Sequence, residues 1–291
     1  MKMLLRLVLS LVFPLALGLH ARLGTADGGQ IQGLPHPPKA FRVLDGTLYE
    51  PKPDLSSFGI EKADVIYEWA LWGGDRSSQA LPVRRRVEEA AHKVTKQGVI
   101  IIDIERYPMR GRSEEVMESI RKYRTVVQWV KGEAPHAVVG LYGQPPVHDY
   151  FRSLTGEGHE EYLSWQREND QLSPLAADVD VILPSLYTFR SDEEDWIKYA
   201  VSKIREARRY GKPVYAFLWP RYHSSNRILG LQYISREFWG LQLRTAYSHA
   251  DGIVLWGGWD FKKKRPQQWD SDAPWWLETK RFMAEIKGYE Q

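Results

Sequence analysis

The chain has 291 residues, of which 43% are hydrophobic and 26% are charged, and these proportions exclude disordered, collagenous and coiled-coil proteins. It contains no cysteine, so a disulfide framework, a thiolate metal site and a cysteine nucleophile are excluded as well. The net charge of +3 gives no argument for nucleic acid binding, for which a clustered basic face is expected. We therefore expect no nucleic acid partner. Of two short basic runs, Arg84–Arg86 and Lys262–Arg265, only the second is kept as a candidate site for an anionic ligand.

The N-terminal segment has the composition of a secretory signal peptide. Lys2 and Arg6 precede an apolar run from Leu7 to Leu19, and small residues follow. Because this run is short for a membrane span, we predict that residues 1–21 are a cleaved leader. Cleavage leaves a secreted or periplasmic protein without stable membrane insertion. An uncleaved N-terminal anchor helix is the alternative.

Residues 22–40 are rich in glycine and proline and are predicted to be a linker. Short apolar runs then alternate with longer amphipathic segments through residues 41–291. The strand candidates are 41–44, 65–71, 99–104, 137–142, 179–186, 214–218 and 252–256. The helix candidates between them include 82–95, 113–131, 193–210 and 235–248.

This alternation predicts an α/β fold, in which a parallel sheet is covered by helices. Seven strand units without a nucleotide-binding glycine loop favour a single distorted TIM-type (β/α)7–8 barrel over a doubly wound sheet. Residues 260–276, which contain three tryptophans, are expected either to form a lid over this barrel or to pack a terminal helix.

The third strand candidate ends in two carboxylates. Side chains on a strand alternate between its faces, so Asp103 and Glu105 are expected to point to the same side, into the barrel mouth. Two neighbouring acids at the end of an apolar strand raise the pKa of at least one of them. A protonated carboxyl beside an ionised one is what acid-catalysed glycosidic cleavage requires. In the structural alternative, Asp103 caps the next helix and Glu105 pairs with Arg106 or Arg110.

The ends of the later strands carry aromatic and polar side chains, and the active sites of β/α barrels lie at these ends. Aromatic faces beside hydroxyl and carboxylate groups suit sugar rings. The residues expected to bind substrate are Tyr142 and Gln144 after the fourth strand, Trp219 and Tyr222 after the sixth, and Trp256, Trp259 and Asp260 after the seventh. Tyr187 ends the fifth strand and is expected at the same rim.

Five runs recur in the same order as in the hyaluronidase family of glycoside hydrolases, which this sequence resembles. They are GVIIIDIERYP at 98–108, GLYG at 140–143, LPSLY at 183–187, KPVYA at 212–216 with PRY at 220–222, and GIVLWG at 252–257. Where the family generally has Asp-Trp-Glu followed by another acid and a tryptophan, this chain has Ile104, Arg106 and Tyr107. The family's disulfides are also missing. These differences retain the acid pair and leave the polymer and the linkage open.

The resemblance implies a distorted β/α barrel that hydrolyses a polysaccharide containing N-acetylhexosamine, with net retention. It implies that the nucleophile is the acetamido oxygen of the substrate, an exception to the usual two-carboxylate mechanism. Glu105 would be the acid and later the base, Asp103 would orient the acetamido group, and Tyr187 would hydrogen-bond it. Tyr142, Tyr222 and Trp256 match sugar-contacting aromatics of the family.

Three other interpretations compete with this one. The chitinase-type strand signature is broken, because Ile101 and Gly98 stand where that signature has aspartates. A polysaccharide lyase and a non-catalytic carbohydrate-binding barrel stay open. The sequence has no zinc-protease, nucleophile-elbow or phosphate-loop motif, and its eight histidines lack ligand spacing, so neither a metal nor a cofactor is expected.

Overall fold

A computed structural model describes residues 40–73, 79–94 and 97–288 of the chain. The predicted leader at residues 1–21 and nearly all of the linker predicted at 22–40 lie outside the described residues. Among the described residues, no helix has the length and apolar character needed to cross a membrane.

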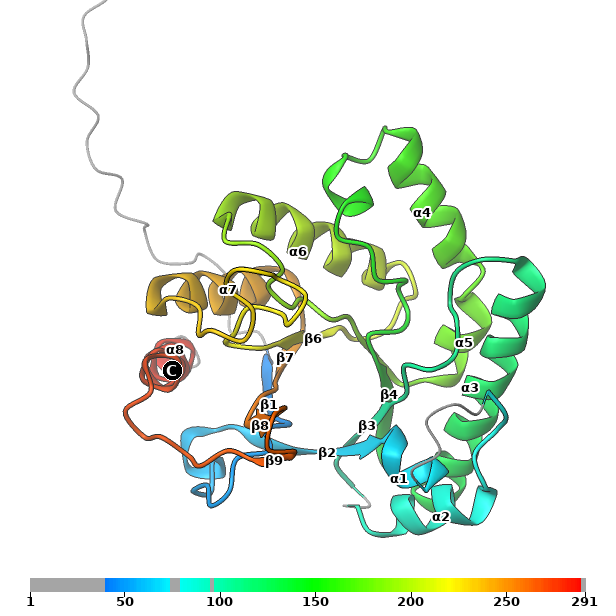
Figure 1. The fold of residues 1–291 in the computed structure, drawn as a ribbon, viewed down its shortest axis with the longest axis horizontal. Coiled ribbons are helices and arrows are strands. Elements are labelled where there is room, and N and C mark those ends of the chain that lie inside the picture. The colour runs from blue at the N-terminus through cyan, green and yellow to red at the C-terminus, as the bar shows by residue number, and fades with distance from the viewer. Residues whose placement is uncertain (1–39, 74–78, 95–96, 289–291) are drawn as a thin grey trace, which may run out of the picture. The chain divides into compact units, whose positions relative to one another are not determined.

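Seven parallel strands form a nearly closed barrel (Figure 1), in the order β5-β4-β3-β2-β1-β7-β6. The edge strands β5 and β6 are joined by parallel bridges from Ile182 to Val214 and from Ser185 to Phe217. The strands are β1 (Arg42–Asp45), β2 (Glu61–Tyr67), β3 (Val99–Asp103), β4 (Val138–Tyr142), β5 (Val181–Leu183), β6 (Tyr215–Leu218) and β7 (Gly252–Leu255). This architecture confirms the predicted TIM-type barrel, with seven strands.

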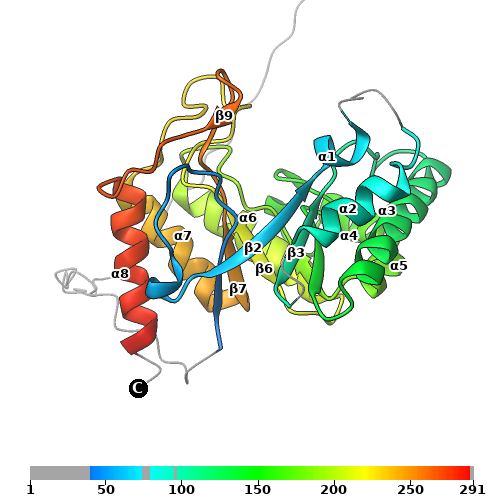
Figure 2. The same cartoon turned by 90° about the horizontal axis from the view of Figure 1, so that it is seen from below.

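Helices surround the strands, as Figures 1 and 2 show. They are α1 (Glu68–Trp72), α2 (Arg84–His92), α3 (Ser113–Glu133), α4 (Glu160–Asp170), α5 (Ser173–Asp178), α6 (Glu193–Arg208), α7 (Arg236–His249) and α8 (Pro274–Gly288). The four predicted helices correspond to α2, α3, α6 and α7, with ends that differ by at most three residues. Their sequences contain apolar residues at helical spacing, and these residues are buried against the barrel.

The barrel strands are apolar on both faces because helices cover them outside and side chains fill them inside. The first four residues of β3 are each at most 1% exposed. Val99 and Ile101 belong to the interior cluster, together with Leu183, Phe217 and Val254 from other strands. Ile100 and Ile102 alternate with them and face the helix layer.

Two strand predictions were wrong in their extent. The strand predicted at 65–71 runs from Glu61 to Tyr67 in the structure. The second half of the predicted range belongs to helix α1. A short apolar run does not distinguish a strand from a buried helical turn, and Gly73 ends this turn with a φ of 61°. The strand predicted at 179–186 is reduced to Val181–Leu183, because Pro184 has no N–H to continue the ladder.

The C-terminal tryptophans support the terminal helix rather than a lid. Trp275 and Trp276 lie on α8 and are buried, and the ring of Trp269 lies 5.0 Å from that of Trp276. Phe58 of the short 3-10 turn η1 (Ser56–Phe58) packs edge-on against Trp276 at 5.1 Å. Helix α8 therefore covers the part of the barrel where the chain between β1 and β2 supplies only η1.

A buried carboxylate on helix α8 binds arginines of helix α7. The Glu278 side chain is 1% exposed and accepts hydrogen bonds from Arg236, Arg244 and Arg281. Gly240 of α7 allows this approach, because a Cβ there would lie 2.4 Å from Glu278 Oε1. The contact joins the last helix to the barrel.

We expect Glu278→Ala to lower the free energy of unfolding by about 1–3 kcal/mol, because it removes the shared acceptor from a buried network. Thermal unfolding measures this effect. Glu285→Ala on the same helix is the control, since Glu285 forms a partly exposed pair with Arg244 and its loss should cost below about 1 kcal/mol. Equal losses for the two variants would contradict the role assigned to Glu278.

Candidate active site

The predicted acid pair lies at the carboxyl end of β3, at the barrel mouth. Asp103 is the last residue of β3 and is partly buried, and the alternation along the strand places it after Val99 and Ile101 of the interior cluster. It lies next to the cavity described below and does not line it. Glu105 follows two residues later and lines a cavity of about 430 Å³. The alternation of side chains along the strand thus brings both acids to the mouth.

Both carboxyl groups have raised pKa values. Burial raises the pKa of Asp103 to about 8, and the negative charges of Glu105 and Glu68 add to this effect. Desolvation also raises the pKa of Glu105, although its side chain reaches solvent, and Glu68 raises it further. The pair therefore holds a proton at neutral pH, which gives the mouth a carboxylic acid beside a carboxylate.

The third acid, Glu68, was not among the predicted site residues. Its Oε2 accepts a hydrogen bond from the backbone N–H of Glu105 at 3.2 Å and another from Arg106 Nε at 3.4 Å. The Arg106 guanidinium lies 3.8 Å from the ring centre of Trp72, also on α1. Helix α1 thereby fixes the loop that carries Glu105. The available signal was that Glu68 directly follows strand β2, but the strand predicted at 65–71 included it.

The loop after β3 does not make the contacts expected of a purely structural acid pair, in which Asp103 caps the next helix and Glu105 pairs with Arg106 or Arg110. The N-cap position of helix α3 is occupied by Arg112, so Asp103 does not cap this helix. Arg106 pairs with Glu68, and Arg110 pairs with Asp149 at 2.8 Å.

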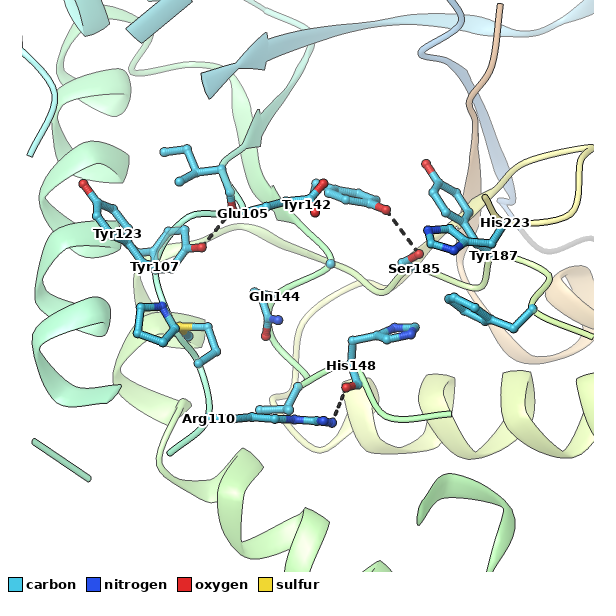
Figure 3. A pocket seen from close by; sticks show the side chains of 16 residues that line it. Glu105, Tyr107, Arg110, Tyr123, Tyr142, Gln144, His148, Ser185, Tyr187 and His223 are labelled. Atoms are coloured by element: carbon cyan, nitrogen blue, oxygen red, sulfur yellow. Dashed lines mark hydrogen bonds between the residues drawn. The ribbon is translucent and has the colours of Figure 1, made fainter. Parts of the chain in front are cut away.

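The cavity beside Glu105 contains several of the predicted residues, as Figure 3 shows. Tyr142, Gln144 and Tyr187 line it together with Glu105. The rings of Tyr142 and Tyr187 are 5.9 Å apart, and the Tyr142 hydroxyl lies 3.4 Å from Ser185 Oγ. The loops after β3, β4 and β5 thus meet around one hollow. Tyr107, Arg110, Tyr123, His148, Phe189 and His223 also line it, and none of them was predicted.

Trp219 and Trp256 lie beside this cavity and do not line it. The ring of Tyr187 lies 5.4 Å from that of Trp219 and 5.7 Å from that of Trp256. Trp256 Nε1 donates a hydrogen bond to the Tyr67 hydroxyl at 3.1 Å, and this contact joins the ends of β7 and β2. The three aromatic rings form a continuous wall at the mouth.

The remaining predicted residues lie outside the cavity lining. Tyr222 is on the loop after β6, where its backbone pairs with Thr188. Trp259 and Asp260 form β8 (Trp259–Asp260) of a small hairpin with β9 (Arg265–Pro266). The Asp260 carboxylate accepts hydrogen bonds from the backbone N–H groups of Lys262 and Lys263, so in this structure it stabilises the hairpin turn. Within the described ranges, no cluster of three or more His, Cys, Asp or Glu side chains could hold a metal ion.

Two solved structures have the same type of barrel. Bee venom hyaluronidase matches with a TM-score of 0.57 and 16% identity, over 86% of this chain and 96% of that chain. The chain shares its fold with this enzyme. The endo-beta-1,4-mannanase from Thermotoga petrophila matches with a TM-score of 0.51 and 14% identity, over 81% of this chain and 60% of that chain. No protein-family model and no curated protein sequence matches the chain.

The likeness confirms a barrel of the kind found in these glycoside hydrolases. At such low identities it does not assign the chain to the hyaluronidase family, and that part of the sequence-based prediction stays a prediction. The bee venom enzyme has also been solved in complex with a hyaluronic acid tetramer, again with a TM-score of 0.57 to this chain.

Proposed function

We propose that the protein is an exported glycoside hydrolase that cleaves a polysaccharide containing N-acetylhexosamine. The observation that carries the proposal is the acid pair Asp103 and Glu105 at the barrel mouth, both with raised pKa values and with Glu105 lining a cavity large enough for a sugar. The barrel shared with bee venom hyaluronidase supports it. Export rests on the N-terminal segment, which has the composition of a leader.

In the proposed mechanism, the single proton of the pair, which Asp103 holds in the free protein, is on Glu105 when substrate is bound. Glu105 then donates this proton to the leaving glycosidic oxygen. The acetamido oxygen of the substrate attacks the anomeric carbon, and the bond to the leaving oxygen breaks. Asp103 orients the acetamido group and stabilises the positive charge of the resulting oxazolinium ion. Glu105, now ionised, takes a proton from water as the water oxygen attacks the anomeric carbon. The bond between this carbon and the acetamido oxygen breaks, so the oxazolinium ring opens and the acetamido group is restored with net retention of configuration.

The surrounding aromatic side chains are placed to hold the sugar. Tyr187 lies within the cavity wall and can direct its hydroxyl to the acetamido group, while Trp219 and Trp256 pack beside it. Burial raises the pKa of Tyr187, so the hydroxyl keeps its proton and can act as a donor. Stacking on such rings holds the apolar face of a pyranose.

The proposal is tested by incubating the purified protein with chitin oligomers, peptidoglycan glycan, hyaluronan and chondroitin, and by assaying new reducing ends. Cleavage of at least one of these polymers with saturated products supports it. Unsaturated uronate products would instead indicate a lyase. Binding without turnover would favour the non-catalytic carbohydrate-binding barrel.

The pH dependence of cleavage should report the acid pair. Because the raised pKa values keep one proton on the pair at neutral pH, activity should fall on the alkaline side near pH 8, where that proton is lost. Glu68→Gln removes a nearby negative charge and should lower both pKa values, which moves the alkaline limb down by on the order of one pH unit.

The profile of kcat against pH checks this expectation. Glu114→Gln, at an exposed position on α3, is the matched control and should leave the limb in place. If the alkaline limb of Glu68→Gln is unchanged or moves to higher pH, the alkaline limb does not report the acid pair.

A further inference from the structure

We propose that the cavity beside Glu105 takes an uncharged sugar, so that the protein acts on a neutral N-acetylhexosamine polymer such as a chitin oligomer rather than on a uronate-containing one. This inference rests on the proposed function and specifies its substrate class. It is drawn from the charges and the unpaired polar atoms of the residues that line the cavity.

The cavity offers no unpaired cation to a uronate. Among its sixteen lining residues, all within the described part of the chain, Arg110 is the only lysine or arginine. Arg110 Nη2 lies 2.8 Å from Asp149 Oδ2, and its Nε lies 3.8 Å from Glu168 Oε2. Both carboxylates also bind Arg152, so two arginines are matched by two acids. A uronate would have to compete with carboxylates that are already in place.

The charges around the acid pair are negative. The buried Lys203, near His148, already donates hydrogen bonds to two backbone carbonyls. Glu105 lines the cavity, and Asp103 and Glu68 are close enough to raise the pKa of a neighbouring acid. A uronate would therefore add a like charge to a poorly solvated acidic site, which is unfavourable. A neutral sugar avoids this repulsion.

The cavity instead presents neutral hydrogen-bonding groups. Gln144 Oε1 and His148 Nδ1 are buried and have no hydrogen-bond partner within the described structure. In Figure 3 the Gln144 side chain points into the hollow, between Tyr107 and His148. Burial, with the nearby positive charges of Lys203 and Arg110, lowers the pKa of His148 to about 3, so its imidazole is neutral.

Unpaired buried polar atoms cost free energy, and a ligand that pairs them recovers it. The hydroxyl and acetamido groups of an N-acetylhexosamine donate and accept hydrogen bonds without carrying charge. They can pair with the carbonyl of Gln144, the neutral ring of His148 and the hydroxyl of Ser185. The arrangement thus fits the polar groups of a neutral sugar.

The test is equilibrium binding of chitotetraose and of a hyaluronan tetrasaccharide to the full-length Glu105→Gln protein. Tryptophan fluorescence is used to measure the binding. This variant slows turnover by about 10²- to 10⁴-fold, and the loss of one negative charge favours the anionic sugar, which makes the comparison conservative. We expect chitotetraose to bind at least about tenfold more tightly, with a Kd that changes by less than about twofold between low and high salt. Hyaluronan binding that is as tight or tighter, or no binding of either sugar, would overturn the inference.

A charge placed in the cavity should reverse the preference. Gln144→Lys in the same background supplies an unpaired cation and should tighten hyaluronan binding by about tenfold or more while weakening chitotetraose binding. Gln171→Lys, at an exposed position just after α4, adds the same charge elsewhere and should change neither. An equal effect of the two substitutions would count against the cavity as the site of discrimination.

Cleavage separates this inference from the proposed function. If the wild-type protein binds chitotetraose tightly without cleaving it, the inference of a neutral cavity stands and the proposed hydrolase activity is refuted. If it cleaves hyaluronan in preference to chitin oligomers, the proposed hydrolase activity stands and the inference of a neutral cavity is refuted.

Discussion

Glu105→Gln should reduce kcat by about 10²- to 10⁴-fold, the usual contribution of a positioned general acid. The amide is nearly isosteric with the carboxyl group, but it cannot protonate the leaving oxygen or later activate water. Because Glu105 reaches solvent at the cavity rim and its backbone N–H is the group that Glu68 binds, the substitution leaves the packing in place. We therefore expect a normal melting temperature and nearly normal substrate binding.

Single-turnover and steady-state reducing-end assays measure this loss. Glu114→Gln on α3 is the matched control and should retain full activity. A Glu105→Gln protein that keeps more than about a third of the wild-type kcat would remove Glu105 from the role of general acid.

Asp103→Asn should reduce kcat by about 10²-fold or more and, at the same time, stabilise the fold. The activity falls because the amide cannot supply the negative charge that the oxazolinium ion requires. The stability rises at a pH at which Asp103 must ionise in its poorly solvated position, because burial raises its pKa in the folded protein from the ordinary value of 3.8 to about 8.

The direction of the stability change follows from proton binding. Between these two pKa values the folded state binds more protons than the unfolded state, so wild-type stability falls as the pH rises from about 4 to about 8. Asparagine does not titrate and removes this loss. Each unit of pKa difference corresponds to about 1.4 kcal/mol, so the melting temperature should rise by several degrees at pH 8 and change little at pH 4.

Melting temperatures of the two proteins at pH 4 and pH 8 check this prediction. Asp178→Asn serves as the control, because Asp178 is ion-paired with Arg124 outside the barrel mouth and its loss should not stabilise the protein. An Asp103→Asn protein that is less stable than the wild type at pH 8 would mean that the carboxylate is favourably bound in the folded state.

The acid pair could be predicted from the sequence because its geometry is local. A strand fixes the direction of every second side chain, so an apolar run followed by acids at 103 and 105 defines both the strand and the side on which the acids lie. The same reasoning placed Tyr142 and Tyr187 at the mouth, since each ends a barrel strand or its extension. Strand ends of a parallel barrel meet at one rim, and this alone brings them together.

Glu68 and the cavity beyond Glu105 could not be predicted in this way. The run after Val65 is apolar and aromatic apart from Glu68, and its pattern does not show that it turns into helix α1 at residue 68, where Trp72 packs on the loop of Arg106. Trp259 and Asp260 follow a strand end as Tyr142 does, yet the chain after β7 turns into a hairpin that uses the Asp260 carboxylate for its own backbone. Proximity in sequence to a strand end is therefore not sufficient to bring a side chain to the cavity.

The sequence by itself determined the alternation of strands and helices, the inward direction of Asp103 and Glu105 and the aromatic character of the rim, because each depends on backbone periodicity over a few residues. The tertiary structure alone decided that Glu68 supports Glu105, that Arg110 is neutralised by Asp149 and Glu168, and that α8 covers the barrel beside η1. These contacts join residues tens of positions or more apart, and their formation depends on how whole helices pack around the closed barrel.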